Sequence, residues 1–432
     1  MKSRILLSGL TALSLLTTTV SAQVVVNISG SSALRGVAID AILASYGSGL
    51  TDFAHTDKNG EVRTARQSIF RGNFPPLGDT IIRCTWSGSL QGIGALASYY
   101  SFEEINQSFL HPSALASEYY ADNFSVGGVA GTHSVGNGQD LAYPGIVFSD
   151  VLPTTSPFDV QNIVTIYDSG PHPVQTQDSF GVFPYVMVAD QGAPAEWTNV
   201  TAGQFRALFG NGFLPLNYFV PTNDSRKVYA TGSNDGSGTR TIALAETAYA
   251  VYSVVQQWKP VTTGAEPTLQ VNTLRLWPQN DGVNRSITWG PDNPGNGGFE
   301  SDGSLRAVLG ATSTNVQLLN SQGSPIGNPG PLLMLSVLGL DDAKIAVANG
   351  AKALSYNGVR ITPTVPLSAS DHAEITEGAY TLWSYAYLLV NYLYTPPEVV
   401  AVLAELQSYV QPEVGLQQMN VSRWDDGATV AP

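Results

Sequence analysis

Hydrophobic and polar positions repeat one order three times along the chain. Each repeat has a short β-branched or apolar run, a turn of Gly, Ser or Asp, and then apolar residues at helical spacing. The first repeat predicts a strand at 24–28, a turn at 29–32 and a helix at 34–42. The second predicts a strand at 80–86, a turn at 87–89 and a helix at 90–97. The third predicts a strand at 228–231, a turn at 235–239 and a helix at 242–255. This order predicts an α/β fold with sites at the carboxyl ends of strands.

Three further segments have patterns of their own. The apolar stretch Leu382–Tyr394 carries Ser384 and Asn391 and is too short to cross a membrane, so it predicts a buried helix. Segment 291–303 is rich in Gly, Asn and Asp, and segment 321–331 is rich in Gly and Pro. Both are typical of surface loops.

The first 22 residues have the pattern of a secretory signal peptide. Lys2 and Arg4 precede an apolar run, and the small residues of 20–22 form a cleavage site after Ala22. A membrane anchor is the alternative, but the run is shorter than the roughly 20 residues that span a bilayer. No Cys follows the site to take a lipid. We therefore expect a periplasmic or secreted protein.

Length and charge limit the kind of protein further. A chain of 432 residues is too long for one ordinary core, and it predicts two lobes of roughly 150 to 200 residues each. The net charge of −14 disfavours binding to nucleic acid or to an anionic membrane surface. Cys84 is the single cysteine, so no intramolecular disulfide forms. Stability must come from burial.

The three Gly/Ser turns carry the candidate chemistry. A helix N-terminus offers unpaired N–H groups and partial positive charge, Gly allows close approach of a ligand, and Ser or Thr adds a hydroxyl donor. Such turns can hold an anion without Lys or Arg. The alternative is that Ser32, Ser89 and Ser237 are merely helix N-caps. Three such turns in one chain favour the anion site.

Six short segments stand out, among them Asp-Gly-Ser-Gly-Thr-Arg at 235–240 and Phe-Ser-Asp at 148–150. Taken in order, the six resemble segments of the substrate-binding proteins of phosphate ABC transporters and their relatives in the type 2 periplasmic fold. Segment 235–240 matches the most recognisable motif of that family, and 148–150 is similar to its Ala-Ser-Asp segment. Each match is short, but together they span most of the chain. The other four lie at 28–33, 87–89, 199–210 and 378–383.

The resemblance implies two α/β lobes joined by two crossovers around a central ligand cleft. Lobe 1 would comprise 23–184 and the return 378–432, and lobe 2 would comprise 185–377. The implied ligand is phosphate or a similar small oxyanion. The chain would be a monomer, and its implied partner is an ABC permease or a sensor. The ligand-binding residues would be Ser31, Ser32, Ala33, Ser87, Ser89, Asp150, Ser237, Gly238, Thr239 and Arg240.

Asp150 has a specific role in this resemblance, because its counterpart accepts the proton of a protonated phosphate. The alternative is a turn or N-cap carboxylate. One departure from the family concerns the arginine two residues before the Asp-Gly-Ser-Gly-Thr motif, where this chain has Ser233. Arg240 or Arg35 could supply a guanidinium instead. The alternative for each is a solvent-exposed helical arginine.

Enzyme classes find little support. The five histidines have no metal-ligand spacing, and neither H-E-x-x-H nor G-x-S-x-G occurs. We expect no catalytic residue, no metal and no cofactor. Two alternatives stay open: a surface or matrix protein that keeps the fold without transport, and a secreted hydrolase.

Overall fold

The computed structural model describes residues 23–423 apart from 58–60, 102–106, 117–120, 127–128, 134–138, 159–162, 166–178, 252, 265–267, 279–293, 392 and 394. The predicted signal peptide lies outside these residues. Within them the chain forms eight α-helices. They are α1 (Arg35–Tyr46), α2 (Ser89–Ser101), α3 (Ala202–Asn211), α4 (Gly238–Glu246), α5 (Asp302–Leu309), α6 (Leu340–Ala348), α7 (Ala369–Thr376) and α8 (Pro397–Tyr409). None of these described helices is long and apolar enough to cross a bilayer.

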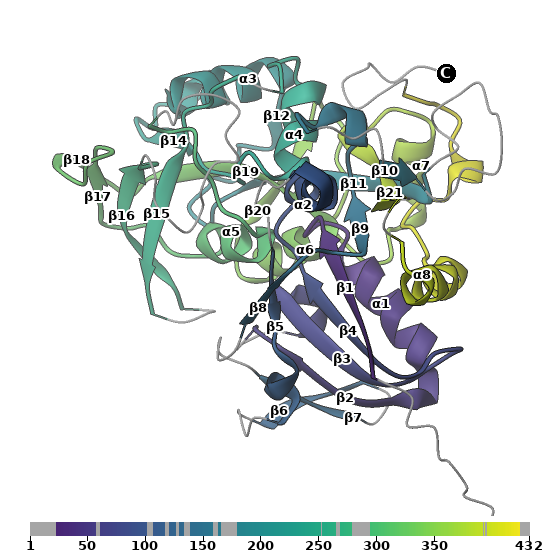
Figure 1. The fold of residues 1–432 in the computed structure, drawn as a ribbon. Coiled ribbons are helices and arrows are strands. Elements are labelled where there is room, and N and C mark those ends of the chain that lie inside the picture. The colour runs from purple at the N-terminus through teal and green to yellow at the C-terminus, as the bar shows by residue number, and fades with distance from the viewer. Residues whose placement is uncertain are drawn as a thin grey trace, which may run out of the picture.

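One large mixed sheet runs through the described part of the molecule (Figure 1). Its strands follow the order β13 (Phe213–Pro215), β14 (Lys227–Ala230), β19 (Leu333–Gly339), β11 (Gly181–Ala189), β21 (Trp383–Asn391), β9 (Ile146–Ser149), β1 (Val24–Gly30), β4 (Gly78–Thr85), β3 (Gln67–Phe74), β2 (Leu50–His55), β7 (Val129–His133) and β6 (Ala121–Val126). Three strands branch from this path: β10 (Ile163–Thr165) pairs with β21, and β20 (Lys352–Tyr356) joins β11 to β12 (Asn199–Val200).

Two smaller sheets lie beside it. Strands β15 (Trp258–Thr263), β16 (Gln270–Leu276), β17 (Val316–Leu319) and β18 (Pro325–Gly330) form one, and β5 (Gln107–Leu110) and β8 (Gln139–Ala142) form the other. The segment 321–331, which was predicted to be a surface loop, is thus largely strand β18, although most of its described side chains are exposed.

Three parallel strands place the first candidate turns at one edge of the sheet. Strand β1 pairs in parallel with β4 on one side, through Ser29 and Thr85, and with β9 on the other, through Ser29 and Val147. Parallel neighbours end at the same edge, because their backbones run in the same direction. The turns after β1, β4 and β9 therefore lie next to one another.

Helices cover both faces of these strands. Side chains alternate between the two faces of a strand, and the neighbours Val147 and Phe148 of β9 pack into different hydrophobic clusters. Val147 shares its cluster with Ile93 of α2, whereas Phe148 shares its cluster with Ile42 of α1 and Val402 of α8. Figure 1 shows α1 and α8 side by side, in agreement with their extensive contact.

Strand β11 carries the chain from one half of the sheet to the other. Its residues 181–184 pair with β21, and its residues 185–189 pair with β19. The chain returns after α7 through Gly378, which has φ 77°, and enters β21 at Trp383. The predicted two-lobed α/β fold with two crossovers is confirmed. The predicted boundaries at 184/185 and 377/378 stay predictions, and we use them to name lobe 1 and lobe 2.

Three element predictions were wrong. Segment 382–394 is mostly the strand β21 rather than a helix, because a strand covered on both faces reads as a continuous apolar run. The surface loop predicted at 291–303 lies outside the described residues at 291–293 and is wrong at its end, where Ser301 caps α5, Asp302 begins it and both are buried. The helix predicted at 242–255 is α4, which begins earlier and ends at Glu246, after which Ala248 has φ 55°.

Candidate functional site

The first two turns meet on the carboxylate of Asp150. The Ser31 hydroxyl donates to Oδ2 at 2.8 Å, and the Ser89 hydroxyl donates to Oδ1 at 2.5 Å. The Asp150 backbone N–H donates in return to the Ser89 oxygen at 3.1 Å. Ser31 follows β1, Ser89 begins α2 and Asp150 follows β9, so the parallel strands bring all three to one point. Asp150 is fully buried, which excludes an exposed turn carboxylate.

Tyr185, at the crossover of β11, completes the contacts of this carboxylate. Its hydroxyl donates to Asp150 Oδ2 at 2.9 Å and lies 2.7 Å from the Ser384 hydroxyl. Burial raises the pKa of Asp150 above its usual range, while the hydrogen bonds from Ser89, Ser31 and Tyr185 act in the opposite direction. Burial and the neighbouring Asp150 carboxylate raise the pKa of Tyr185 well above its usual range. The site therefore holds a proton acceptor shielded from water.

The third turn, from lobe 2, packs directly onto the same carboxylate. A Cβ atom at Gly238 would lie 1.5 Å from Asp150 Oδ1. A Cβ atom at Gly88, which has φ 112°, would lie 2.3 Å from the carbonyl oxygen of Gly236. The Leu90 N–H donates to that carbonyl at 3.1 Å. Glycine at 88 and 238 thus allows the two lobes to touch backbone to backbone at the site.

The other predicted residues of the first two turns lie around this centre. The Ser32 hydroxyl accepts from the backbone N–H of Asp302 at 3.4 Å, and the N–H of Ala33 donates to Ser31 Oγ at 3.1 Å. The hydroxyls of Ser87 and Thr239 are buried without a hydrogen-bond partner in the described structure. Buried donors of this kind are costly unless something accepts from them.

Ser237 and Arg240 have other contacts. The Ser237 hydroxyl accepts from the N–H of Arg240 at 3.3 Å and caps α4. It is the one candidate serine of the three that caps its helix through a side chain, since Ser32 and Ser89 bond elsewhere. Both Arg240 guanidinium Nη atoms donate to Asn296, at 2.8 and 2.6 Å, and burial lowers the pKa of Arg240. Arg240 is thus buried, and its guanidinium is directed to Asn296.

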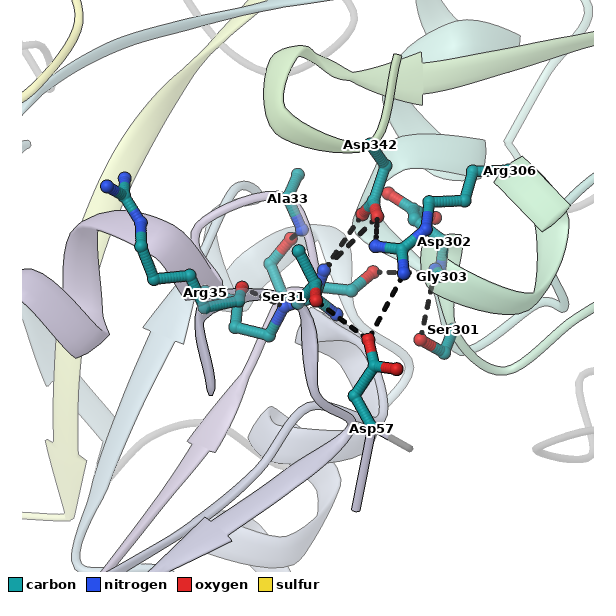
Figure 2. Close-up of polar contacts among 12 residues, drawn as sticks. Ser31, Ala33, Arg35, Asp57, Ser301, Asp302, Gly303, Arg306 and Asp342 are labelled. Atoms are coloured by element: carbon teal, nitrogen blue, oxygen red, sulfur yellow. Dashed lines mark hydrogen bonds and ion pairs between the residues drawn. The ribbon is translucent and has the colours of Figure 1, made fainter. Parts of the chain in front are cut away.

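Arg35 is also fully buried, contrary to the solvent-exposed alternative. Its guanidinium donates to the Asp342 carboxylate of lobe 2 at 3.0 Å and to the carbonyl of Arg63 at 2.7 Å. Arg306 of lobe 2 donates to the same Asp342 at 2.9 Å and to Asp57 of lobe 1 at 3.1 Å. Figure 2 shows this chain of contacts, in which charges alternate in sign across the boundary between the lobes.

Sequence reasoning missed four residues of this region: Tyr185, Asp302, Arg306 and Asp342. Tyr185 lies in an apolar strand, where nothing in the pattern sets it apart. Asp302 follows Ser301, which accepts from the Gly303 N–H at 3.2 Å as a helix N-cap, and a Ser-Asp start before apolar residues could have indicated that helix. The partners of Arg306 and Asp342 are distant in sequence and carry no local signal.

Comparisons with known proteins give remote similarities. No protein-family model matches the chain, and no curated protein matches it. An ABC-type phosphate transport receptor from Vibrio cholerae is 12% identical, with a TM-score of 0.40, over 89% of this chain and 93% of the receptor. PstS from Borrelia burgdorferi is 12% identical, with a TM-score of 0.34, over 89% and 92%. At such values the ligand of this chain has to be argued from its own residues.

Proposed function

We propose that this protein is a non-enzymatic solute-binding protein, which holds a protonated small oxyanion, phosphate foremost, between its two lobes. The observation that carries the proposal is the meeting of three strand-to-helix turns on one buried carboxylate. Hydroxyls and helix N-termini supply donors for an anion, and Asp150 accepts its proton. The protein is exported and cleaved after Ala22, and an ABC permease or a sensor binds its closed form.

Ligand entry in this proposal requires the lobes to separate. Ser31 and Ser89 donate to Asp150, and Gly238 lies against that carboxylate. An anion reaches these donors only when lobe 2 moves away from lobe 1. On closure, the anion gains donors from both lobes, among them the unpartnered hydroxyl of Thr239. Contacts made only in the closed form are what allow a ligand to favour that form.

A second candidate function has one specific observation in its favour. Asp342 accepts from Arg35 of lobe 1 and from Arg306 of lobe 2. A carboxylate of the protein itself therefore uses donors that would otherwise be available to an anion. A surface or matrix protein that keeps the fold and binds no small anion fits this observation. Titration calorimetry with phosphate, arsenate and sulfate separates the two candidates, since the second predicts no heat of binding at millimolar concentration.

Two hydroxyl deletions test the shared site. Ser89→Ala and Thr239→Val should each weaken phosphate binding by roughly tenfold to a hundredfold, because each removes a hydrogen bond to a charged ligand. Thr201→Val is the matched control: Thr201 caps α3 through its hydroxyl and is exposed, so phosphate affinity should not change. Calorimetry on the three variants gives the result. Unchanged affinity in both site variants would contradict the shared site.

Asp150→Asn tests the selection of a protonated anion. A carboxylate accepts from the O–H of phosphate but repels sulfate, which carries no proton at neutral pH. The amide can also donate, so the preference for phosphate over sulfate should fall by at least about tenfold, or about 1.4 kcal/mol. Asp79→Asn, at a half-exposed carboxylate paired with Arg71, should leave that preference as it is. A wild-type protein that prefers sulfate would remove the proposed role of Asp150.

A further inference from the structure

Asp302 places a second buried carboxylate between the lobes. It is the first residue of α5, and its side chain is 1% exposed. Its backbone N–H donates to Ser32 of the first turn, and its Oδ1 accepts from the Ser233 hydroxyl at 3.2 Å. Ser233 stands just before the third turn. Asp302 thus lies between the first and third turns, which are two of the three turns at the Asp150 site.

The second oxygen of this carboxylate, Oδ2, has no hydrogen-bond partner in the described structure. A buried carboxylate oxygen without a donor carries a desolvation cost that protein groups usually relieve. Arg35 and Arg306 of the same region donate to Asp342 instead. A ligand with an O–H group could supply the missing donor.

Charged groups of several other elements act on Asp302. Asp342 of α6 and Asp150 after β9 disfavour its ionised form, and Arg35 of α1 favours it, as does the hydrogen bond from Ser233. Tyr185 of β11 also lies within electrostatic range. Burial and the Asp342 charge raise the pKa of Asp302 to about 7. The group therefore changes its protonation near neutral pH.

We propose that Asp302 is a second proton-sharing carboxyl group of the ligand site, so that the protein takes a dihydrogen oxyanion of the H2PO4− class. The inference rests on the proposed function. One O–H of the ligand donates to Asp150 and the other to Asp302. A dihydrogen anion beside ionised Asp302 has the same proton count as a monohydrogen dianion beside protonated Asp302. In either form, the ligand and Asp302 together carry one proton more than a monohydrogen ligand bound to Asp150 alone.

Proton uptake on binding is the measurable consequence. At about pH 8, free phosphate is mostly the dianion and free Asp302 is mostly ionised, so formation of the complex takes up about one proton. The observed affinity should then fall about tenfold for each pH unit above 8. Asp302→Asn should bind the dianion through its amide, with almost no proton uptake and an affinity independent of pH in this range.

Calorimetry with inorganic phosphate at about pH 8, in two buffers of different ionisation enthalpy, counts the protons. Glu300→Gln is the control: it removes one negative charge two residues away, from an ion pair with Arg66 across the lobes, and should keep the uptake of about one proton. Uptake in the wild type and in Glu300→Gln but not in Asp302→Asn supports the inference.

Wild-type binding without proton uptake, or unchanged uptake in Asp302→Asn, overturns the inference and leaves the proposed function in place. The wild-type measurement decides this alone if Asp302→Asn does not fold. Absence of binding of phosphate and arsenate to the wild type at millimolar concentration overturns the proposed function, and this inference with it.

Discussion

Asp342→Ala should lower the free energy of unfolding by about 3–5 kcal/mol, because it leaves two buried guanidinium groups without their shared carboxylate. The side chains of Asp342, Arg35 and Arg306 are 1%, 1% and 5% exposed, so water cannot replace the lost partner. Arg35 also donates to the carbonyl of Arg63, and Arg306 also donates to the carboxylate of Asp57. In the Asp342→Ala variant these contacts would hold the two guanidinium groups in place and prevent them from moving apart.

Asp79→Ala is the control for this experiment. Asp79 pairs with Arg71 at 3.2 Å, but both side chains are 46% exposed. A pair of this kind contributes about 0–1 kcal/mol, since water solvates either charge alone. Chemical denaturation of both variants at one pH measures the difference. Equal and small losses of stability would mean that the Asp342 network does not hold the lobes together.

The part of the fold that could be predicted is the part set by local pattern. The β-branched run 24–28, the Gly/Ser turn after it and the apolar spacing behind it predict a strand, turn and helix, which are β1 and α1. The segment 382–394 was misread, because an apolar run has no period that separates a buried strand from a buried helix. Its four tyrosines and one tryptophan favour a strand, whereas its length fits either element.

The part of the site that could be predicted follows the same rule. Ser31, Ser89 and Asp150 stand directly after predicted strands, and parallel pairing brings them together. Asp302 and Asp342 come from lobe 2 and reach the site only through the packing of the two lobes. Charge pairing across 307 residues, as between Arg35 and Asp342, leaves no trace in local spacing. Local pattern therefore predicts the donors of the site together with Asp150, but not the carboxylates that lobe 2 contributes.

Those missed carboxylates change the chemistry more than the missing arginine at position 233 does. From the sequence, Arg240 and Arg35 were the two cations that could replace that arginine. In the structure, both are buried and donate to groups of the protein, Asn296 and Asp342. The positive charge at the site thus comes mainly from helix N-termini, which are weaker than a guanidinium. Under the proposed function, the ligand that such a site favours is an anion of low charge that carries its own protons.

Gly238→Ala should prevent the lobes from closing on each other, with a loss of phosphate affinity of about a hundredfold or more. The added Cβ atom would lie 1.5 Å from Asp150 Oδ1, far inside van der Waals contact. Asp150 cannot turn away without losing the hydrogen bonds from Ser31, Ser89 and Tyr185. Overpacking of this kind costs about 1–3 kcal/mol or more. The third turn must therefore move away from lobe 1, which X-ray scattering should register as a larger radius of gyration.

A matched control and a double variant separate this collision from a general effect of alanine. Gly203 lies in the first turn of α3, as Gly238 does in α4, but a Cβ atom there finds its nearest neighbour, Thr201 Oγ1, at 4.0 Å. Gly203→Ala should therefore stabilise the protein by up to about 1 kcal/mol through helix propensity. In the Asp150→Ala background the cost of Gly238→Ala should largely vanish, because the atom it meets is gone. A cost that persists in that background would locate the damage in α4 itself and not in the contact between the lobes.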